Sequence, residues 1–334
     1  MVSYRPHMSL HLDERSAPMT DAEEVAALPS SIEPVTMAPM DGRGLTSHPA
    51  GAFSVEQLLA AKARTGTTVS VCLPARDEEA TVGAVVAAIR VALIDDVGLV
   101  DEIVVVDDHS SDRTAEVAAA AGARVVDASA VLTDHGEGHG KGEALWKSVH
   151  ESVGDLVVWV DADILDFDPY FIIGLLGPLL TDPATSFVKG HYHRPEANGV
   201  GGGRVTELLA RPLLSQFFPE LSEVAQPLGG EYAGRRELLE QLPFVVGYGV
   251  DVALLIDAFR TVGIEGLAQV DLGVRHHRNR TLEDLGPQAL AVSQAILDRA
   301  GLRPPGPAVL RRPGREPLPM AMHERPPLAS LRPV

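Results

Sequence analysis

The stretch that most constrains the fold is an apolar run, Leu156-Val157-Val158-Trp159-Val160, which ends abruptly in Asp161-Ala162-Asp163. A short β-branched run predicts a buried strand that delivers its acids to the carboxyl edge of a sheet, where open α/β sheets bind ligands. Side chains one residue apart face opposite sides of a regular strand, so both acids reach one site only if the chain bends there. Such a pair suits Mg²⁺ or Mn²⁺, but an isolated D-x-D is also compatible with two solvated acids.

Strands and helices alternate on both sides of this run. Strands are expected at residues 67–73, 102–106, 123–126, 185–194 and 267–272, and helices at 81–93, 112–121, 141–153, 168–180, 252–262 and 283–300. Asp112 or Ser111 should cap the second helix, and Gly122 should end it. This alternation predicts an α/β fold with a mostly parallel sheet flanked by helices.

Composition limits the possible functions and the compartment. The net charge of −18 argues against nucleic-acid binding, which depends on basic patches. A single cysteine, Cys72, excludes a disulfide within the chain and favours the cytoplasm, and no stretch approaches the ~20 apolar residues of a membrane span. We therefore expect no stable membrane association. If this acidic protein binds anions, its cations should be concentrated locally, as they are at residues 189–204 and 275–280.

A dinucleotide-binding Rossmann domain is disfavoured by the turn after the first strand. That turn requires a G-x-G-x-x-G motif, whereas Pro74-Ala75-Arg76-Asp77-Glu78-Glu79 contains no glycine. Gly140-Lys141-Gly142 opens a helix and could meet a phosphate. A lysine between glycines is more often a solvated loop residue, however, and the P-loop frame is absent.

Two later segments suggest anion binding. The glycines of Gly199-Val200-Gly201-Gly202-Gly203, followed by Arg204, can form an anion nest at a helix start, although a flexible connector has the same composition. The segment Arg275-His276-His277-Arg278-Asn279-Arg280 concentrates cations and imidazoles. His276 or His277 could complete a metal site with a carboxylate, and the arginines could face phosphates.

The ordered motifs carry a resemblance. Four motifs resemble those of nucleotide-diphospho-sugar transferases of the glycosyltransferase-A fold. They are Pro74 to Glu79, Val106-Asp107-Asp108-His109-Ser110-Ser111-Asp112, Gly140-Lys141-Gly142 and Asp161-Ala162-Asp163. Four later segments resemble one family within this group, the glucosyl-3-phosphoglycerate synthases. They are Gly202 to Leu208, Gly230-Glu231-Tyr232-Ala233, Gly247-Tyr248-Gly249-Val250 and Leu272 to Arg280. The resemblance extends from about Thr68 to Leu302, and a further short match lies at Arg325-Pro326-Pro327.

The resemblance implies a reaction and a set of roles. Glucose would pass from UDP-glucose to the 2-hydroxyl of D-3-phosphoglycerate with retention of the α configuration, catalysed by Asp251, Leu228 and Arg275. Mg²⁺ or Mn²⁺ would be bound by Asp163 and His277, and the acceptor by Gly203, Arg204, Val205, Thr206 and Asn279. The nucleotide sugar would contact Pro74, Ala75, Arg76, Asp77, Glu78, Ser110, Lys141, Asp161, Ala162, Tyr248, Gly249, Val250, Asp251, Arg275, Arg278 and Arg280.

Three alternative reactions stay open. The family usually has Glu at the position of Asp251, and the loop between Arg194 and Gly201 is short, so mannosyl-3-phosphoglycerate synthesis from GDP-mannose is a neighbouring possibility. An inverting polyprenyl-phosphate hexosyltransferase would need an amphipathic or spanning segment. A nucleotidyltransferase would need a Gly-rich, Arg-containing motif in place of Pro74 to Glu79.

Composition at the two ends and the extent of the resemblance divide the chain. Residues 1–50 are expected to form a disordered extension and residues 303–334 a Pro-rich, extended tail. Residues 51–302 would form the transferase domain, with a nucleotide-binding half at about 68–165 and an acceptor half at about 166–302. A homodimer is also expected.

Overall fold

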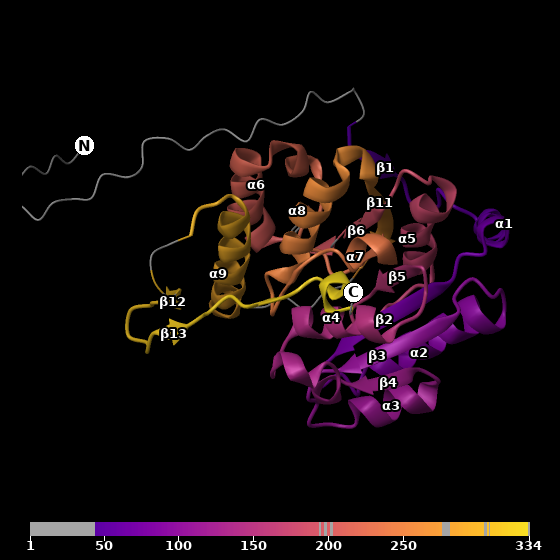
Figure 1. Cartoon of the computed structure of the whole chain (residues 1–334), viewed down its shortest axis with the longest axis horizontal. Helices are drawn as coiled ribbons and strands as arrows, with labels where there is room; N and C mark the ends of the chain where they lie inside the picture. Colours follow the sequence, from indigo (N-terminus) through magenta and orange to yellow (C-terminus); the bar gives the residue numbers. More distant parts are fainter. Residues whose placement is uncertain are drawn as a thin grey trace, which may run out of the picture. The chain divides into compact units, whose positions relative to one another are not determined.

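The central feature of the fold is a twisted sheet (Figure 1). A computed structural model describes residues 44–193, 195–196, 199–200, 203–275, 281–303, 306 and 308–332. Within these residues the sheet has eight strands in the order β1-β11-β6-β9-β5-β2-β3-β4. The strands are β1 Thr46–His48, β2 Val69–Ala75, β3 Glu102–Asp107, β4 Arg124–Asp127, β5 Leu156–Trp159, β6 Phe187–His193, β9 Tyr232–Arg235 and β11 Leu267–Val274.

The strand pairing confirms the predicted mostly parallel sheet. Within the described part of this eight-stranded sheet, only β9 runs antiparallel to its neighbours, β5 and β6. The sequence prediction missed β9, because Tyr232-Ala233-Gly234-Arg235 is too short to show alternation and follows two glycines. Its central position explains its burial, since Tyr232 and Ala233 are fully buried.

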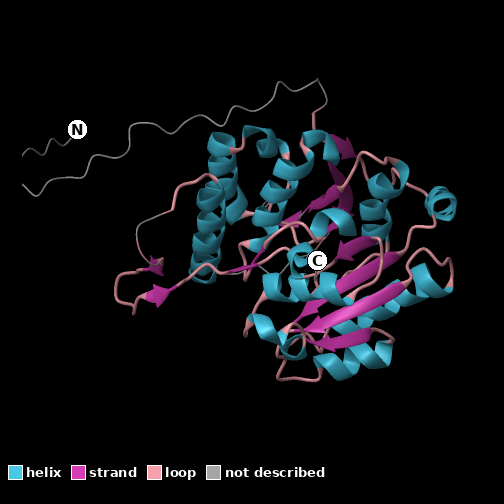
Figure 2. Cartoon of the chain, viewed as in Figure 1, coloured by secondary structure: helices cyan, strands magenta, loops and turns pink. Residues whose placement is uncertain are grey.

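Helices cover both faces of the sheet (Figure 2). Their bounds are α1 Val55–Thr65, α2 Val82–Ile89, α3 Thr114–Ala121, α4 Lys141–Glu151, α5 Tyr170–Thr181, α6 Arg211–Phe217, α7 Arg236–Leu239, α8 Val250–Val262 and α9 Leu282–Arg299. None of the described helices combines the length and the hydropathy needed to cross a bilayer.

Successive residues of the inner strands enter different cores. On β3, Val104 and Val106 pack in one cluster with α4 and α8, whereas Val105 packs in the other with α2 and α5. Because side chains alternate across a strand, a run that is apolar at every position is buried on both faces. This is why the predicted inner strands lack a polar face.

Several predicted boundaries shift. β2 continues through Pro74 and Ala75, which is tolerated because pairing with β5 ends at Cys72. The helix after Asp112 is assigned from Thr114, but Asp112 Oδ1 does accept from the Thr114 N–H at 2.9 Å, and Gly122 ends the helix with φ 103°. Helix α5 begins at Tyr170, so Pro169 precedes it.

Both chain ends needed correction where they are described. We expected disorder up to about residue 50, yet Thr46–His48 forms β1 and pairs in parallel with β11. We also expected residues 303–334 to extend as a tail. Instead Glu324–Arg325 pairs with Phe244–Val245, and Leu328 is buried in the core. The extended backbone of this segment is therefore part of the packed protein.

Candidate functional site

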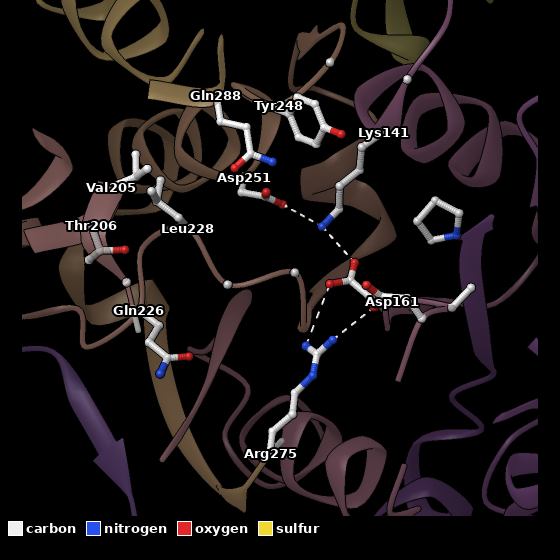
Figure 3. A pocket seen from close by; sticks show the side chains of 18 of the residues that line it. Lys141, Asp161, Val205, Thr206, Gln226, Leu228, Tyr248, Asp251, Arg275 and Gln288 are labelled. Atoms are coloured by element: carbon white, nitrogen blue, oxygen red, sulfur yellow. Dashed lines mark hydrogen bonds and ion pairs between the residues drawn. The ribbon is translucent and has the colours of Figure 1, made fainter. Parts of the chain in front are cut away.

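A cavity of about 870 Å³ opens along the carboxyl edge of the sheet (Figure 3). It lies where the ends of β2, β5 and β6 meet the first turns of α4 and α8. The predicted site residues that line it are Pro74, Ala75, Arg76, Glu78, Lys141, Asp161, Ala162, Asp163, Gly203, Arg204, Val205, Thr206, Leu228, Tyr248, Asp251 and Arg275. Asp77, Ser110, Gly249 and Val250 are not among the lining residues. His276, His277, Arg278, Asn279 and Arg280 lie outside the described residues.

The acidic pair after β5 meets the residue that follows β11. Arg275 Nη2 is 3.1 Å from Asp163 Oδ1, and Nη1 is 3.8 Å from Asp161 Oδ2. β5 ends at Trp159, so both acids lie beyond regular strand geometry. The expected bend is therefore present, and it directs both carboxylates toward one guanidinium although 112 positions separate Asp163 from Arg275.

Lys141, in the first turn of α4, joins two acids from different elements. Its Nζ donates to Asp161 Oδ1 at 2.9 Å and forms an ion pair with Asp251 Oδ1 at 3.2 Å (Figure 3). Burial by itself lowers the pKa of Lys141, but the charges of Asp161 and Asp251 outweigh burial and raise it. Lys141 is thus a permanent cation that links the tip of β5 to the start of α8.

Gly230 allows this ion pair to form against the backbone. A Cβ at this position would lie 2.4 Å from Asp161 Oδ2 and 2.5 Å from Lys141 Nζ. Any side chain there would have to displace one of the two charged groups. The glycine is therefore a steric requirement of the site.

Glu231 is a buried acid that the sequence prediction did not include. Its side chain is fully buried and forms a very short ion pair with Arg275, whose own side chain is 2% exposed. Tyr192 Oη accepts a further hydrogen bond from Arg275 Nη1 at 3.0 Å. Burial raises the pKa of Glu231, and the Arg275 charge opposes that rise. Glu231 thus fixes the orientation of Arg275, while Nη2 faces Asp163 and Nη1 lies near Asp161.

Lys189 on β6 was also missed as a site residue. Its Nζ donates to the Gly229 carbonyl at 2.6 Å and lies 4.3 Å from the centre of the Tyr232 ring. Burial lowers the pKa of Lys189 to about 8. Its only sequence signal was its place at the start of the basic region 189–204. It supports the turn that presents Leu228 and Gly230.

The loop after β2 is held by the loop after β3. Asp77 adopts φ 55°, its N–H donates to Ser110 Oγ at 3.0 Å, and its Oδ1 accepts from the Ser111 N–H at 2.7 Å. Glu78 N–H donates to Thr114 Oγ1 at 2.7 Å. Asp77 and Ser110 therefore fix the shape of the loop that brings Arg76 and Glu78 to the cavity.

Three carboxylates converge on the cavity in a way that suits a hard cation. Burial raises the pKa of Glu78, and the negative charges of Asp163 and, more weakly, Asp161 raise it further. Like charges held together in this way are stabilised by a divalent ion with oxygen ligands. The donor set therefore fits Mg²⁺ or Mn²⁺ at Asp163, while the expected second ligand, His277, lies outside the described residues.

The opposite side of the cavity is formed by the segment after residue 203 and by α9. Figure 3 shows Val205, Thr206 and Leu228 across the cavity from Lys141 and Asp161. Leu285 and Gln288 of α9 also line it. These two were not predicted, because an amphipathic helix gives no signal for which of its residues borders a site. The site therefore has an ionic side and a mixed polar and apolar side.

Comparisons with known proteins agree with this geometry. The family model for glycosyl transferase family 2 matches residues 70–247. The glucosyl-3-phosphoglycerate synthase of Mycolicibacterium smegmatis is 47% identical over 309 residues, which cover 88% of this chain and 100% of that protein.

Two solved structures are similar over most of the chain. The glucosyl-3-phosphoglycerate synthase of Mycobacterium tuberculosis, solved with Mn²⁺, UDP-glucose and phosphoglyceric acid, has a TM-score of 0.79 and 45% identity, covering 86% of this chain and 99% of that one. The mannosyl-3-phosphoglycerate synthase of Rubrobacter xylanophilus has a TM-score of 0.78 and 39% identity, covering 86% and 96%. The chain thus belongs to glycosyl transferase family 2 and, within it, to the glucosyl-3-phosphoglycerate synthases.

Proposed function

We propose that this protein transfers glucose from UDP-glucose to the 2-hydroxyl of D-3-phosphoglycerate. The observation that carries the proposal is the convergence of Asp161, Asp163, Lys141 and Arg275 on one cavity. An acidic protein that binds two anionic ligands needs such a local concentration of cations. The complex of the M. tuberculosis relative with UDP-glucose and phosphoglyceric acid supports the same pair of substrates.

The donor is proposed to bind at the ionic side of the cavity. Pro74, Ala75, Arg76, Asp77, Glu78 and Ser110 would hold the uridine directly or through the loop, with Lys141, Asp161 and Ala162 beside it. Tyr248, Gly249, Val250, Arg278 and Arg280 would surround the sugar and phosphates. The acceptor would bind at Gly203, Arg204, Val205, Thr206 and Asn279; of these, Val205 and Thr206 lie across the cavity from Lys141 (Figure 3).

Asp163 and His277 would hold Mg²⁺ or Mn²⁺, and the bound ion would neutralise charge on the diphosphate. Arg275 is aligned for the same charge, because Glu231 and Tyr192 fix its guanidinium before any ligand enters. Groups that are already oriented stabilise the departing diphosphate without rearranging during the reaction. Lys141 adds a second cation within reach of Asp161.

Retention of the α configuration requires the acceptor hydroxyl to approach the face from which the diphosphate departs. The hydroxyl can then pass its proton to the departing phosphate oxygen, while its own oxygen forms the new bond to the anomeric carbon. No protein base is needed for this transfer. Asp251, held beside Lys141, would orient the sugar and stabilise positive charge at the anomeric carbon, and Leu228 would border the acceptor.

The role of Asp251 has a direct test. The Asp251→Asn variant keeps the size of the side chain but removes its charge. It should lower kcat by about 100-fold or more, the loss typical of removing one electrostatic group at a reacting centre, while UDP-glucose still binds. Wild-type kcat with normal donor binding would rule out this role.

The substrate pair is tested by product release across a donor and acceptor panel. UDP should be released from UDP-glucose with Mg²⁺ or Mn²⁺ only when 3-phosphoglycerate is present. Release of GDP from GDP-mannose at a higher rate would favour mannosyl-3-phosphoglycerate synthesis, for which the similarity to the R. xylanophilus structure is the supporting observation. Glucose 1-phosphate with UTP, and a polyprenyl phosphate acceptor, test the nucleotidyltransferase and inverting hexosyltransferase alternatives.

The organisation of the protein is also proposed in part. We propose that residues 51–302 form the main part of the transferase domain, with its nucleotide-binding half at about 68–165, and that Thr46–His48 and Glu324–Leu328, which pack on it, belong to the same domain. A cytoplasmic location fits the single, buried Cys72, which is unpaired. The expected homodimer is a prediction that light scattering after size-exclusion chromatography would check.

A further inference from the structure

Asp108, His109 and His139 form a cluster of potential metal ligands that the proposed reaction does not use. Asp108 and His109 follow β3, and His139 precedes α4. His109 Nδ1 is 3.0 Å from Asp108 Oδ1 and 3.2 Å from His139 Nδ1. Among the residues that the structure describes, this is the one group of three such donors within 4.8 Å of one another.

The spacing of the donors matches a tetrahedral metal site. Zinc binds imidazole nitrogen at about 2.0–2.1 Å, so neighbouring ligands of a tetrahedral site lie about 3.3 Å apart. The two short separations in the cluster are close to that value. An ion between the three atoms would be bound by a lone pair of each and would displace any proton at either Nδ1.

The ligands are held in place by the fold. Asp108 is buried, and its Oδ2 accepts from the Gly140 N–H at 2.7 Å, which leaves Oδ1 directed at His109. Such outer hydrogen bonds orient metal ligands. His109 itself adopts φ 61°, a left-handed conformation that is unfavourable for a residue with a Cβ and persists only where the surroundings require it. The imidazole is thereby turned toward Asp108 and His139.

We propose that Asp108 Oδ1, His109 Nδ1 and His139 Nδ1 bind a divalent transition-metal ion of the Zn²⁺ class. Two imidazoles and one carboxylate select such an ion over Mg²⁺, which prefers oxygen ligands alone. The site is separate from the ion expected at Asp163. Asp108 and His139 also line the cavity, so the fourth coordination position is open to a ligand that enters it.

The proposal is tested with the metal alone, on the full chain stripped of metal. The Asp163→Asn background removes a ligand of the expected Mg²⁺ or Mn²⁺ site, so that Zn²⁺ titration by calorimetry and visible absorption of bound Co²⁺ report on the new site. His109→Gly removes one ligand and suits the left-handed backbone. His139→Ala removes another, and His139→Gln repeats this change with a larger side chain if the Ala variant melts early. The control is His150→Ala, which removes a half-exposed imidazole of α4.

One equivalent of Zn²⁺ should bind to the Asp163→Asn protein, and the His150→Ala control should bind it equally well. Each ligand variant should weaken this binding by at least about 10-fold, the minimum reported even for outer-shell changes, and should remove the intense absorption of tetrahedral Co²⁺. Unchanged Zn²⁺ affinity in either the His109 or the His139 variant, or no equivalent lost relative to the control, would overturn the proposal. No substrate is present, so the outcome is independent of the proposed transferase reaction.

Discussion

Replacing Arg275 with Met should destabilise the protein strongly, because its guanidinium neutralises the buried carboxylate of Glu231. The Glu231 side chain has no exposed surface and that of Arg275 is 2% exposed. Removal of one partner from a buried ion pair costs about 3–5 kcal/mol of unfolding free energy. Met retains much of the length of the side chain, so most of the loss should come from the unpaired charge.

The same change should make stability depend on pH. Burial raises the pKa of Glu231, and Arg275 opposes that rise, so the Met variant should raise the pKa further. A carboxyl with a raised folded-state pKa binds a proton that the unfolded chain has already lost, so stability falls as pH increases above the unfolded value. Relative to wild type, the variant should lose up to about 1.4 kcal/mol per pH unit while Glu231 remains protonated in the folded state.

Urea unfolding followed by the fluorescence of Trp146 and Trp159 measures both effects. The double variant Arg275→Met/Glu231→Gln should recover most of the lost stability and lose the pH slope that Glu231 causes, since neither side chain of this pair is then charged. It should not recover donor turnover, because Asp163 still lacks its ion pair with Arg275 and the cavity has lost one of its cations. A loss below about 1 kcal/mol in Arg275→Met, with no pH slope, would refute the assigned pairing.

Three further changes follow from the same contacts. Gly230→Ala should lower turnover by about 100-fold by displacing Lys141 or Asp161, whereas Gly229→Ala, whose nearest contacts would be 3.3 Å, should have a much smaller effect in the same steady-state assay. Arg325→Ala should cost about 3 kcal/mol in urea unfolding, because buried Glu143 keeps only Lys147 as a partner; a loss as small as that of exposed Arg332→Ala would contradict this. The pKa of Lys189 falls to about 8 on folding, so wild-type stability should gain a contribution as pH rises from about 8 toward 10.5, and Lys189→Met should lack that gain; parallel stability curves would exclude it.

The parts of the fold that could be predicted are those encoded by local sequence. β2, β3 and β5 are short runs of mostly apolar residues, and such runs are buried on both faces of a parallel sheet. The turn at Gly122 and the acidic end of β5 were likewise visible, because glycine and paired carboxylates mark where a chain changes direction. The approach of Arg275 to Asp161 and Asp163 follows from the predicted topology, because carboxyl ends of parallel strands share one edge.

The features that could not be predicted depend on distant partners. β9 becomes a strand only because it is inserted between β5 and β6. In the sequence, Arg325 belongs to a Pro-rich segment with no sign of packing. In the structure it forms an ion pair with buried Glu143, and the neighbouring Pro326 carbonyl accepts a hydrogen bond from Trp146 Nε1 at 2.9 Å. Glu231 and Lys189 lie in segments whose hydrophobic residues show no helical or strand periodicity. Their burial beside the site therefore depends on tertiary packing and could not be predicted from local sequence.

The most direct test of the account is the structure of the product formed from UDP-glucose and D-3-phosphoglycerate with Mn²⁺. Nuclear magnetic resonance should show an α-linked glucose on the 2-hydroxyl of the glycerate, together with one equivalent of UDP. The Asp163→Asn variant should form the same product far more slowly. A β-linked product, or UDP released at the same rate without 3-phosphoglycerate, would contradict the proposed reaction.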